Sequence, residues 1–529
     1  MSDKWYKSIL QRKYIVPLCL VLVALIWDMW YHVFQGQAML DSDMSSEMVL
    51  ADILNKEHSV TGLTTSWIYS TEIRVFYMQW IYRIGLFLFP WSWHAARTFS
   101  MFVALILYAF ACWLVFYTVK KPDIGLWAAA FALLPGGSWY FWYVICAGAY
   151  LPCLYISLFS IALILMVANA PGRKRNWIYT VILMILGLLS GMNGVKQLMI
   201  FYAPLVVAAF VPVAFEFFSA ASDGKLSAQS VRIFVLSALG SFTSFVGYII
   251  NSKVLSSRYM FTSYEDENLF DGDFLDQLDY FIHSFGYGNS RKVVSFSGLA
   301  GFLGLALGIV ILFISFWYLV RYETLNREYR LIASISSTVI LFVCFVFSIT
   351  YGCGIDYMMS LVPFGYFVLL IWIFSAKQIL EKRRYALILI AWAVLLITSA
   401  GTVMNESDNP YHPLVARPGL AKVVDQLKDM GYTEGISRFW TSNVVTELSD
   451  GTIDMWTIEY EDDGSYDWKK WLQRVDHMDS FPQGRYFYLM SKKTLSGTDE
   501  IEDEAALFTQ DHPGLGIVYE DDNYLVYGN

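Results

Sequence analysis

The sequence predicts an all-α polytopic membrane protein, with about 11 transmembrane helices, that ends in a C-terminal extracellular α/β domain. Hydrophobic residues make up 56% of the 529 residues and charged residues only 16%, whereas soluble domains carry about 25% charged residues. The apolar residues also form long blocks. Aromatic residues account for 17% of the chain, which suits rings placed at two water–lipid boundaries. This composition excludes an ordinary soluble enzyme and a disordered chain.

The predicted spans are the segments that supply roughly 20 mostly apolar residues, the length that crosses a hydrocarbon core of about 30 Å. They lie near residues 14–34, 97–118, 124–145, 148–168, 177–194, 197–218, 231–252, 296–320, 330–350, 356–376 and 384–404. The stretch 72–90 is also apolar, but Glu72, Arg74 and Arg83 interrupt it. We therefore expect an interfacial helix there, lying on the membrane.

Lysine and arginine clusters set the expected orientation. They precede the first span and then fall in alternate short loops, at residues 4–13, 120–121, 173–175, 321–330 and 377–384. The positive-inside rule then puts the N-terminus in the cytoplasm and the C-terminal segment outside. We expect a multi-pass protein of the cell membrane, whose first span ends in Asp28 and aromatic residues rather than in a cleavage site.

The chain changes character near residue 404. Residues 405–529 carry about 24 acidic against about 10 basic residues, so this segment would repel nucleic acid. We expect a transmembrane domain over 1–404, with external loops at 35–96 and 253–295, and an acidic α/β domain over 405–529. All six cysteines lie in or beside apolar segments, so no disulfide framework is expected.

Three carboxylates follow the first span directly. Apolar residues at helical spacing predict a helix from about Asp43, preceded by Asp41. Asp43 and Glu47 would share a face, and two like charges at this spacing repel unless a positive group lies between them. Either these aspartates cap the helix and Glu47 is solvated, or the three carboxylates at the mouth of a membrane bundle perform chemistry.

Two further groups could bind a ligand. In the same loop, Trp67, Tyr69, Glu72 and Arg74 combine an indole, a hydroxyl, a carboxylate and a guanidinium, a mixture suited to a polyhydroxylated or phosphorylated ligand. The alternative is a capped interfacial helix with an aromatic anchor. The other group is cationic and consists of Lys196 and Arg258.

Lys196 follows a turn with two glycines, at the expected level of the outer lipid phosphates. Arg258 lies just beyond the seventh predicted span. Both cations suit a phosphate group. The alternative for Lys196 is a lysine that extends its ammonium to the interface without binding a ligand.

The motif Asp41, Asp43 and Glu47 behind the first span, the surface helices, the second external loop and the external C-terminal domain together resemble the GT-C superfamily of polyprenyl-phosphate-sugar-dependent integral membrane glycosyltransferases. The segment from Asp41 to Arg74 also resembles multi-spanning proteins of Gram-positive bacteria, which suggests a bacterial subfamily. The resemblance implies a GT-C-like fold and a hexosyltransferase. The donor would be a polyprenyl-phosphate-linked sugar, and the extracytoplasmic acceptor a cell-wall or surface glycan, a lipid or a protein.

The resemblance also implies roles for the site residues. Because polyprenyl phosphate is a good leaving group, displacement at C1 of the sugar requires a base for the acceptor hydroxyl and a cation for the departing phosphate. The base would be Asp43, with Asp41 the next choice, and the single displacement would invert the anomeric configuration. Substrate binding would fall to Glu47, Trp67, Tyr69, Glu72, Arg74, Lys196 and Arg258. No cofactor is required, although the Asp-x-Asp pair of Asp41 and Asp43 offers oxygens to Mg²⁺ or Mn²⁺.

Two other classes stay open. A transporter or flippase of lipid-linked or small polar substrates would concentrate polar groups in mid-membrane and show internal symmetry, whereas this chain concentrates them in its predicted external segments. A surface receptor or assembly factor also fits the C-terminal domain. Four tryptophans of that domain could stack on sugar rings or pack in its core: Trp440, Trp456, Trp468 and Trp471.

Overall fold

The computed structural model describes residues 12–218, 226–262, 274–287, 292, 294–322, 325, 327–346, 358–375, 383–407, 419–460, 465–492 and 507–529. The chain divides into two compact units. The first, here called the helical unit, comprises Met1–Asp28, Ala104–Lys253 and Glu265–Asp408. The second, here called the mixed unit, comprises Met29–Val103, Val254–Tyr264 and Asn409–Asn529. The mixed unit thus combines residues of both predicted external loops with the C-terminal segment.

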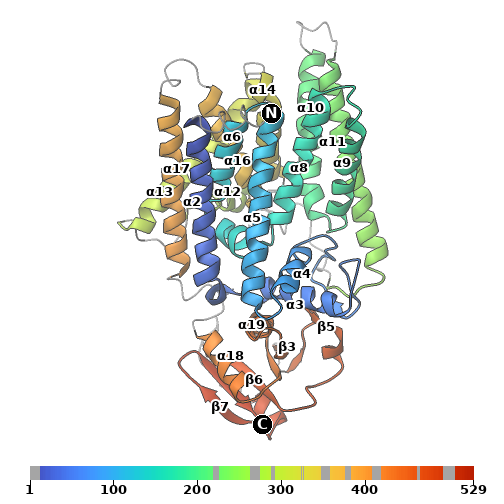
Figure 1. Cartoon of the computed structure of the whole chain (residues 1–529), viewed down its shortest axis with the longest axis vertical. Helices are drawn as coiled ribbons and strands as arrows, with labels where there is room; N and C mark the ends of the chain where they lie inside the picture. The colour runs from blue at the N-terminus through green and yellow to red at the C-terminus, as the bar shows by residue number, and fades with distance from the viewer. Residues whose placement is uncertain are drawn as a thin grey trace. The chain divides into compact units, whose positions relative to one another are not determined.

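The helical unit is built from apolar helices (Figure 1). They are α2 (Arg12–Phe34), α5 (Trp93–Thr118), α6 (Pro122–Ala132), α7 (Ser138–Tyr140), α8 (Leu151–Asn169), α9 (Asn176–Gly191), α10 (Ala203–Phe218), α11 (Ala228–Ile250), α12 (Phe274–His283), α13 (Phe296–Val320), α14 (Arg327–Val346), α16 (Val362–Ser375) and α17 (Arg384–Ser407). The end of α2 and the start of α5 fall in the mixed unit. Single turns of π-helix occur at η2 (Phe141–Cys146), η3 (Leu198–Tyr202) and η5 (Asn251–Leu255).

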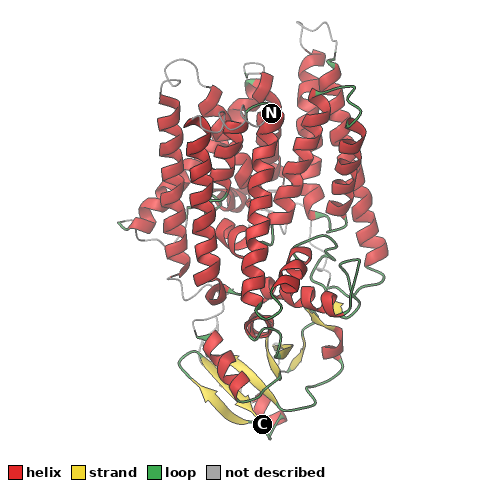
Figure 2. Ribbon diagram, viewed as in Figure 1, coloured by secondary structure: helices red, strands yellow, loops and turns green. Residues whose placement is uncertain are grey.

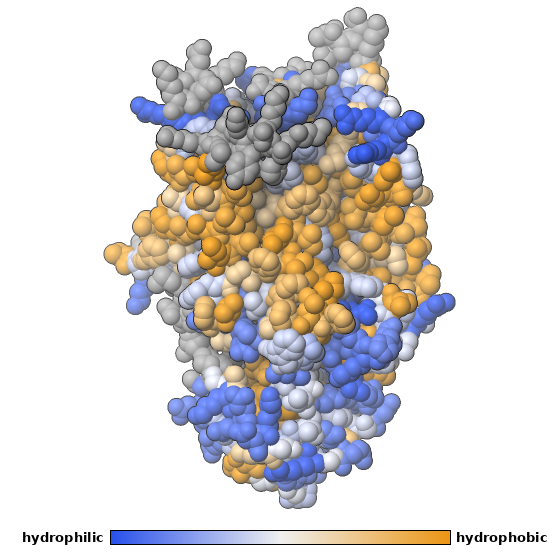
Figure 3. Space-filling model, viewed as in Figure 1, coloured by the Kyte–Doolittle hydropathy of each residue, from blue (hydrophilic) through white to orange (hydrophobic). Residues whose placement is uncertain are grey.

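Among the described residues, 7 helices are long and apolar enough to cross a membrane, and three shorter apolar helices accompany them. The 7 are Lys13–Phe34, Trp93–Thr118, Leu151–Asn169, Leu198–Phe218, Ala228–Leu255, Phe296–Val320 and Arg384–Val403. Large side chains such as Phe242, Phe302 and Phe313 are 55–67% exposed, and Figure 3 shows hydrophobic residues gathered over these helices. Exposed apolar surface of this extent suits lipid rather than water, so the predicted multi-pass membrane protein is confirmed.

The expected span at 124–145 is not one continuous helix. Helix α6 ends at Ala132, and Pro135, Gly136 and Gly137 separate it from α7 and η2. Proline cannot continue the helical hydrogen bonding. Gly137 also lies against the chain at His283, whose carbonyl oxygen would be 2.1 Å from a Cβ on this glycine. The backbone therefore breaks where hydropathy alone predicts a span.

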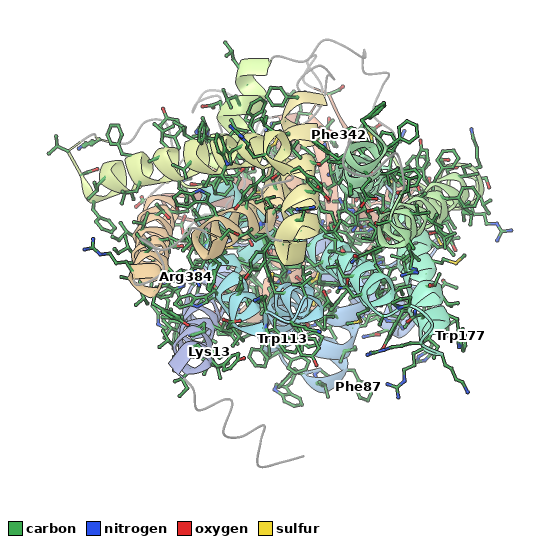
Figure 4. The ribbon with its side chains drawn as sticks, turned by 90° about the horizontal axis from the view of Figure 1, so that it is seen from above. Lys13, Phe87, Trp113, Trp177, Phe342 and Arg384 are labelled. Carbon is green, nitrogen blue, oxygen red and sulfur yellow. The ribbon has the colours of Figure 1, made fainter. Side chains whose placement is uncertain are left out.

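Helices α9 and α11 pack through small residues. A Cβ on Gly191 would meet the Ser244 carbonyl oxygen at 1.8 Å, and a Cβ on Gly247 would meet the Leu188 carbonyl oxygen at 2.2 Å. Close backbone approach through glycine is a common solution in membranes, where packing rather than the hydrophobic effect drives helix association. Figure 4 shows Trp177, on the same α9, at the periphery of the bundle, where it is 67% exposed.

The mixed unit contains all the β-strands that the structure describes (Figure 2). Its loop part has η1 (Gly36–Met39), α3 (Ser42–Lys56), β1 (Trp67–Ile68) and α4 (Gln79–Leu88). Its C-terminal part has α18 (Leu420–Asp429), β2 (Glu434–Arg438), α19 (Phe439–Leu448), β3 (Asp454–Tyr460), β4 (Tyr466–Trp468), β5 (Gln473–Arg474), η10 (Val475–Met478), β6 (Tyr486–Ser491), β7 (Gly516–Glu520) and β8 (Tyr524–Gly528). The predicted C-terminal α/β region with a small sheet is therefore confirmed, and its bounds as a domain over 405–529 stay a prediction. Helix α4 falls within the predicted interfacial stretch 72–90, and its place at a membrane surface stays a prediction.

A six-stranded sheet organises the C-terminal part, in the order β4-β3-β2-β6-β8-β7. Strand β2 runs parallel to β3 and β6, and the remaining pairs are antiparallel. One hydrophobic core combines Val423 of α18, Val444 of α19 and Phe487 of β6, and Leu40 from the loop part joins it. A second core holds Trp456 and Tyr488. Strand β1 of the loop pairs with β5, so the loop part and the C-terminal part share both a core and a ladder.

Candidate active site

Asp41 caps helix α3. Its backbone is extended, and its Oδ1 accepts a hydrogen bond of 2.7 Å from the Met44 backbone nitrogen. The side chain is buried, as suits a carboxylate that satisfies a free N–H of the first helical turn. Asp43 follows in that first turn, and its residue is exposed. The structure thus gives the two aspartates different surroundings, a cap for Asp41 and an open carboxylate for Asp43.

Arg74 is the positive group that the spacing of Asp43 and Glu47 required. Its Nη1 lies 3.3 Å from Glu47 Oε1, and its charge also acts on Asp43. The guanidinium packs over the Tyr77 ring, 4.7 Å from the centroid, and the Arg74 carbonyl accepts a hydrogen bond of 2.7 Å from Gln79 Nε2. Arg74 is therefore held at its guanidinium and at its backbone carbonyl. The structure thus brings together three predicted site residues, Asp43, Glu47 and Arg74.

The protein around Asp43 shifts its proton affinity. Desolvation raises the pKa of Asp43 above its ordinary value, and this outweighs the opposing effects of Arg74, of a hydrogen bond with Trp471 and of Lys469. Burial likewise raises the pKa of Glu47 despite Arg74 and Arg97. A carboxylate with a raised pKa is a stronger base while it can still be ionised at neutral pH. Asp43 is therefore the candidate general base of this site.

A buried ion pair that the sequence analysis missed holds the start of α3. Arg97 on α5 and Glu447 on α19 have side chains only 5% and 3% exposed, with Arg97 Nη2 2.7 Å from Glu447 Oε2. The same Nη2 donates to the Met44 carbonyl at 3.0 Å, and Nη1 donates to the Tyr82 hydroxyl at 3.0 Å. Burial raises the pKa of Tyr82 to about 12, so this hydroxyl stays protonated. Arg97 was visible in the sequence as a charge opening an apolar segment, whereas Glu447 gave no signal.

A cavity of about 530 Å³ adjoins Asp43. Its other lining residues all come from the C-terminal part: Arg438, Phe439, Trp440, Ile458, Glu459, Tyr460, Lys469 and Trp471. Trp440 and Trp471 were expected either to stack on sugar rings or to pack in the domain core, and none of the eight residues was expected beside Asp43. No local pattern could have predicted this, because about 400 residues separate α3 from this wall.

The remaining predicted residues have other surroundings. Trp67 and Tyr69 are 1% and 3% exposed. Trp67 pairs with Arg474 in the β1–β5 ladder, and burial raises the pKa of Tyr69, whose hydroxyl accepts a 3.0 Å hydrogen bond from the Thr64 nitrogen. Both therefore pack inside the mixed unit, and Glu72 is half-buried there.

The two predicted phosphate ligands lie in different units. Lys196 belongs to the helical unit, where its Nζ donates a 2.6 Å hydrogen bond to the Tyr150 hydroxyl and lies 5.0 Å from that ring's centroid. Gly194, two residues earlier, has φ = 107° and provides the turn. Arg258 belongs to the mixed unit and is exposed.

The Asp-x-Asp pair does not fit a divalent cation in this arrangement. Asp41 is occupied as a helix cap, and Asp43 faces Arg74, Lys469 and the Trp471 indole, all of which are cations or donors. Within the described residues, no group of three or more His, Cys, Asp or Glu is placed to hold a metal ion.

Comparison with known proteins places this fold. No protein-family model matches the sequence, and no curated protein matches it. Among solved structures, ArnT from Cupriavidus metallidurans bound to undecaprenyl phosphate matches with 11% identity and a TM-score of 0.57, over 97% of this chain and 98% of that chain. Its apo state matches with 12% identity and a TM-score of 0.57, over 97% of both chains. The Archaeoglobus fulgidus oligosaccharyltransferase, in complex with Zn and sulfate, gives 12% identity and a TM-score of 0.49, over 83% of this chain and 61% of that chain.

The match to ArnT covers both units and nearly the whole length of each chain. At this low identity it establishes the fold and not the activity. The chain therefore shares the fold of ArnT.

The buried pair of Arg97 and Glu447 can be tested by removing either charge. Arg97→Gln or Glu447→Gln leaves one buried charge without its partner, so we expect each to lower the free energy of unfolding by about 3–5 kcal/mol. The double variant should cost less than the sum of the two. Denaturant unfolding of the detergent-solubilised protein measures all three.

A matched control is Lys492→Met, which breaks the exposed 2.6 Å pair with Glu520 in the C-terminal part. Exposed pairs contribute about 1 kcal/mol or less. If Arg97→Gln were no more destabilising than this control, the buried pair would not be what holds α3 and α19 together.

Proposed function

We propose that the protein is a glycosyltransferase, more specifically a hexosyltransferase. It would transfer a hexose from a polyprenyl-phosphate donor to an extracytoplasmic acceptor of the cell envelope. The observation that supports this most directly is Asp43, an open carboxylate with a raised pKa beside Glu47 and Arg74, in a GT-C fold. The ArnT match is to a protein bound to undecaprenyl phosphate, and this supports a polyprenyl-phosphate donor here.

The reaction is one displacement. The acceptor oxygen attacks C1 of the sugar, Asp43 takes the proton from the acceptor hydroxyl, and the bond between C1 and the phosphate oxygen breaks with its electron pair remaining on the phosphate. The anomeric configuration inverts. Asp43 is preferred over Asp41 as the base, because the Asp41 carboxylate already accepts a backbone hydrogen bond. Glu47 is tied to Arg74 and positions that cation.

Asp43→Asn removes the base while nearly preserving shape. We expect turnover to fall about 10²- to 10⁴-fold at unchanged expression, measured as sugar transfer from the polyprenyl-phosphate donor. The control is Asp52→Asn on the same helix, where Asp52 pairs with Lys56 at 2.7 Å, and its rate should match the parent. Because only ionised Asp43 accepts a proton, activity should fall as the pH decreases through the raised pKa, at a pH above the ordinary aspartate value of about 4. Parent-like turnover of Asp43→Asn would remove the assignment.

We further propose that Lys196, with Arg258 as a second contributor, binds the donor phosphate. The Lys196 ammonium is partly buried and held by Tyr150, which suits a phosphate ligand. A charge-assisted hydrogen bond contributes about 1.5–3 kcal/mol, so Lys196→Met should weaken function about 10- to 150-fold. Because charge on the departing oxygen grows as the bond breaks, kcat should fall as well as donor affinity. If Lys196→Met and Arg258→Met both behave like the parent, the phosphate binds elsewhere, with Arg74 the next candidate.

The proposed orientation has the N-terminus in the cytoplasm and the C-terminal domain outside, as the alternating cationic loops indicate. Single cysteines at Lys174 and Gln483, both exposed, can report it in a background that lacks the six native cysteines. An impermeant thiol reagent added to intact cells should label the Gln483 position only. Labelling of both positions from outside would contradict the proposed topology.

A further inference from the structure

The cavity beside Asp43 has a wall of residues from the C-terminal part that have no role in the displacement proposed above. We propose that this cavity is the acceptor subsite and that its acceptor is a carbohydrate, bound by the C-terminal part with a hydroxyl directed at Asp43. This inference rests on the proposed function and specifies its acceptor class. At about 530 Å³, the cavity falls in the range of about 300–1,000 Å³ that is usual for small-molecule sites.

Two tryptophans of this wall, Trp440 and Trp471, reach the surface of the domain. Trp440 is 40% exposed, whereas Trp456 is 7% exposed and lies in the second core. Trp471 is partly exposed and bonds to Asp43. Phe439 supports Trp440 edge-on, with 5.0 Å between the ring centroids. An indole beside a carboxylate offers a flat apolar face and a polar edge, which matches the C–H face and the hydroxyl rim of a pyranose.

The polar groups of the cavity are both donors and acceptors. Lys469 Nζ lies 2.6 Å from Glu459 Oε1, and the Arg438 guanidinium lies over the Tyr460 ring, 5.1 Å from its centroid. With Asp43, the cavity therefore presents two cations and two carboxylates. Sugar hydroxyls donate and accept, so they can use all four groups. A lipid chain would need a largely apolar lining, and a ligand of one charge sign would meet groups of its own sign here.

A strained turn positions part of this wall. Leu472 has φ = 47°, in the left-handed region that costs energy for a branched side chain. The turn is held on both sides: the Lys469 nitrogen donates to the Thr457 carbonyl at 3.0 Å, and Asn443 Nδ2 donates to the Leu472 carbonyl at 3.0 Å. Gln473, 2% exposed, accepts from the Thr457 nitrogen at 3.1 Å. These bonds fix Lys469 and Trp471 before any ligand binds, and such preorganisation reduces the entropy lost on binding.

Direct binding tests the inference without requiring the donor. The whole chain is placed in lipid nanodiscs free of sugar-based detergent, and saturation-transfer NMR is recorded with cellobiose, maltose, N-acetylglucosamine and, as the competing acceptor class, the peptide acetyl-Gly-Ser-Gly-amide. We expect at least one of the sugars to bind and the peptide not to bind. Trp440→Ala should weaken that binding about 2- to 10-fold, while Trp440→Phe should largely restore it.

The control is Trp91→Ala, which removes another exposed tryptophan of the mixed unit, 72% exposed and outside the cavity, and it should bind sugar like the parent. In the transfer assay, Trp440→Ala should raise KM for the acceptor and leave KM for the donor unchanged. Binding of the peptide alone, the absence of binding by all four probes, or sugar binding unaffected by Trp440→Ala would each overturn the inference. Asp43→Asn separates it from the proposed function: if that variant still binds sugar and still transfers, the base assignment fails while the acceptor subsite stands.

Discussion

The buried pair of Arg97 and Glu447 is the interaction on which the rest of the mixed unit depends. Two charges removed from water are stable only when they are close together and their remaining hydrogen-bonding capacity is used. Arg97 uses it on the Met44 carbonyl and the Tyr82 hydroxyl. One side chain therefore connects α5, α4, α3 and α19, and it does so one residue from Asp43. The Ser42 hydroxyl also donates to the Phe439 carbonyl, so the first turn of α3 is fixed at the first turn of α19.

This fixed geometry explains the electrostatics of Asp43. One side of Asp43 stays exposed. On the other side, packing of α19 and the 469–473 turn around α3 removes part of the hydration of the carboxylate and so raises its pKa, while Lys469 and Trp471 of the same segments lower it. The net effect is a raised pKa, which would make Asp43 a stronger base than a solvated aspartate. On an isolated amphipathic helix, the carboxylate would be neither desolvated by packing nor contacted by Lys469 and Trp471. The role proposed for Asp43 thus depends on the C-terminal part.

The sequence could predict what local patterns determine. Long apolar blocks specify membrane helices, and the repulsion of Asp43 and Glu47 at helical spacing required a cation, which proved to be Arg74. It could not predict the partners of Arg97 or the wall of the cavity, since 350 residues separate Arg97 from Glu447 and only the tertiary fold joins them. The break at Pro135 was readable in the sequence, but a hydropathy average over about 20 residues conceals it. The sequence also could not predict that Asp41 rather than Asp43 would cap α3. Either aspartate can act as a cap, and the outcome depends on which of the two has an extended backbone.

The proposed base belongs to the loop part of the mixed unit, and the proposed acceptor wall belongs to its C-terminal part. This arrangement has a consequence for acceptor specificity. The proposed base lies on the regular helix α3, whose start is held by a buried ion pair. Trp440 lies at the start of α19, and Lys469 and Trp471 lie in a turn of the C-terminal part. Side chains in such connecting segments can change with little effect on the cores below them. Under the proposed function, a substitution of the exposed Trp440 side chain would therefore change acceptor binding, whereas a substitution of Lys469 or Trp471 would also change the pKa of Asp43. In the proposed function, the base on α3 and the acceptor wall on α19 and the 469–472 turn thus lie on different elements, and the shared core and the β1–β5 ladder hold these elements together.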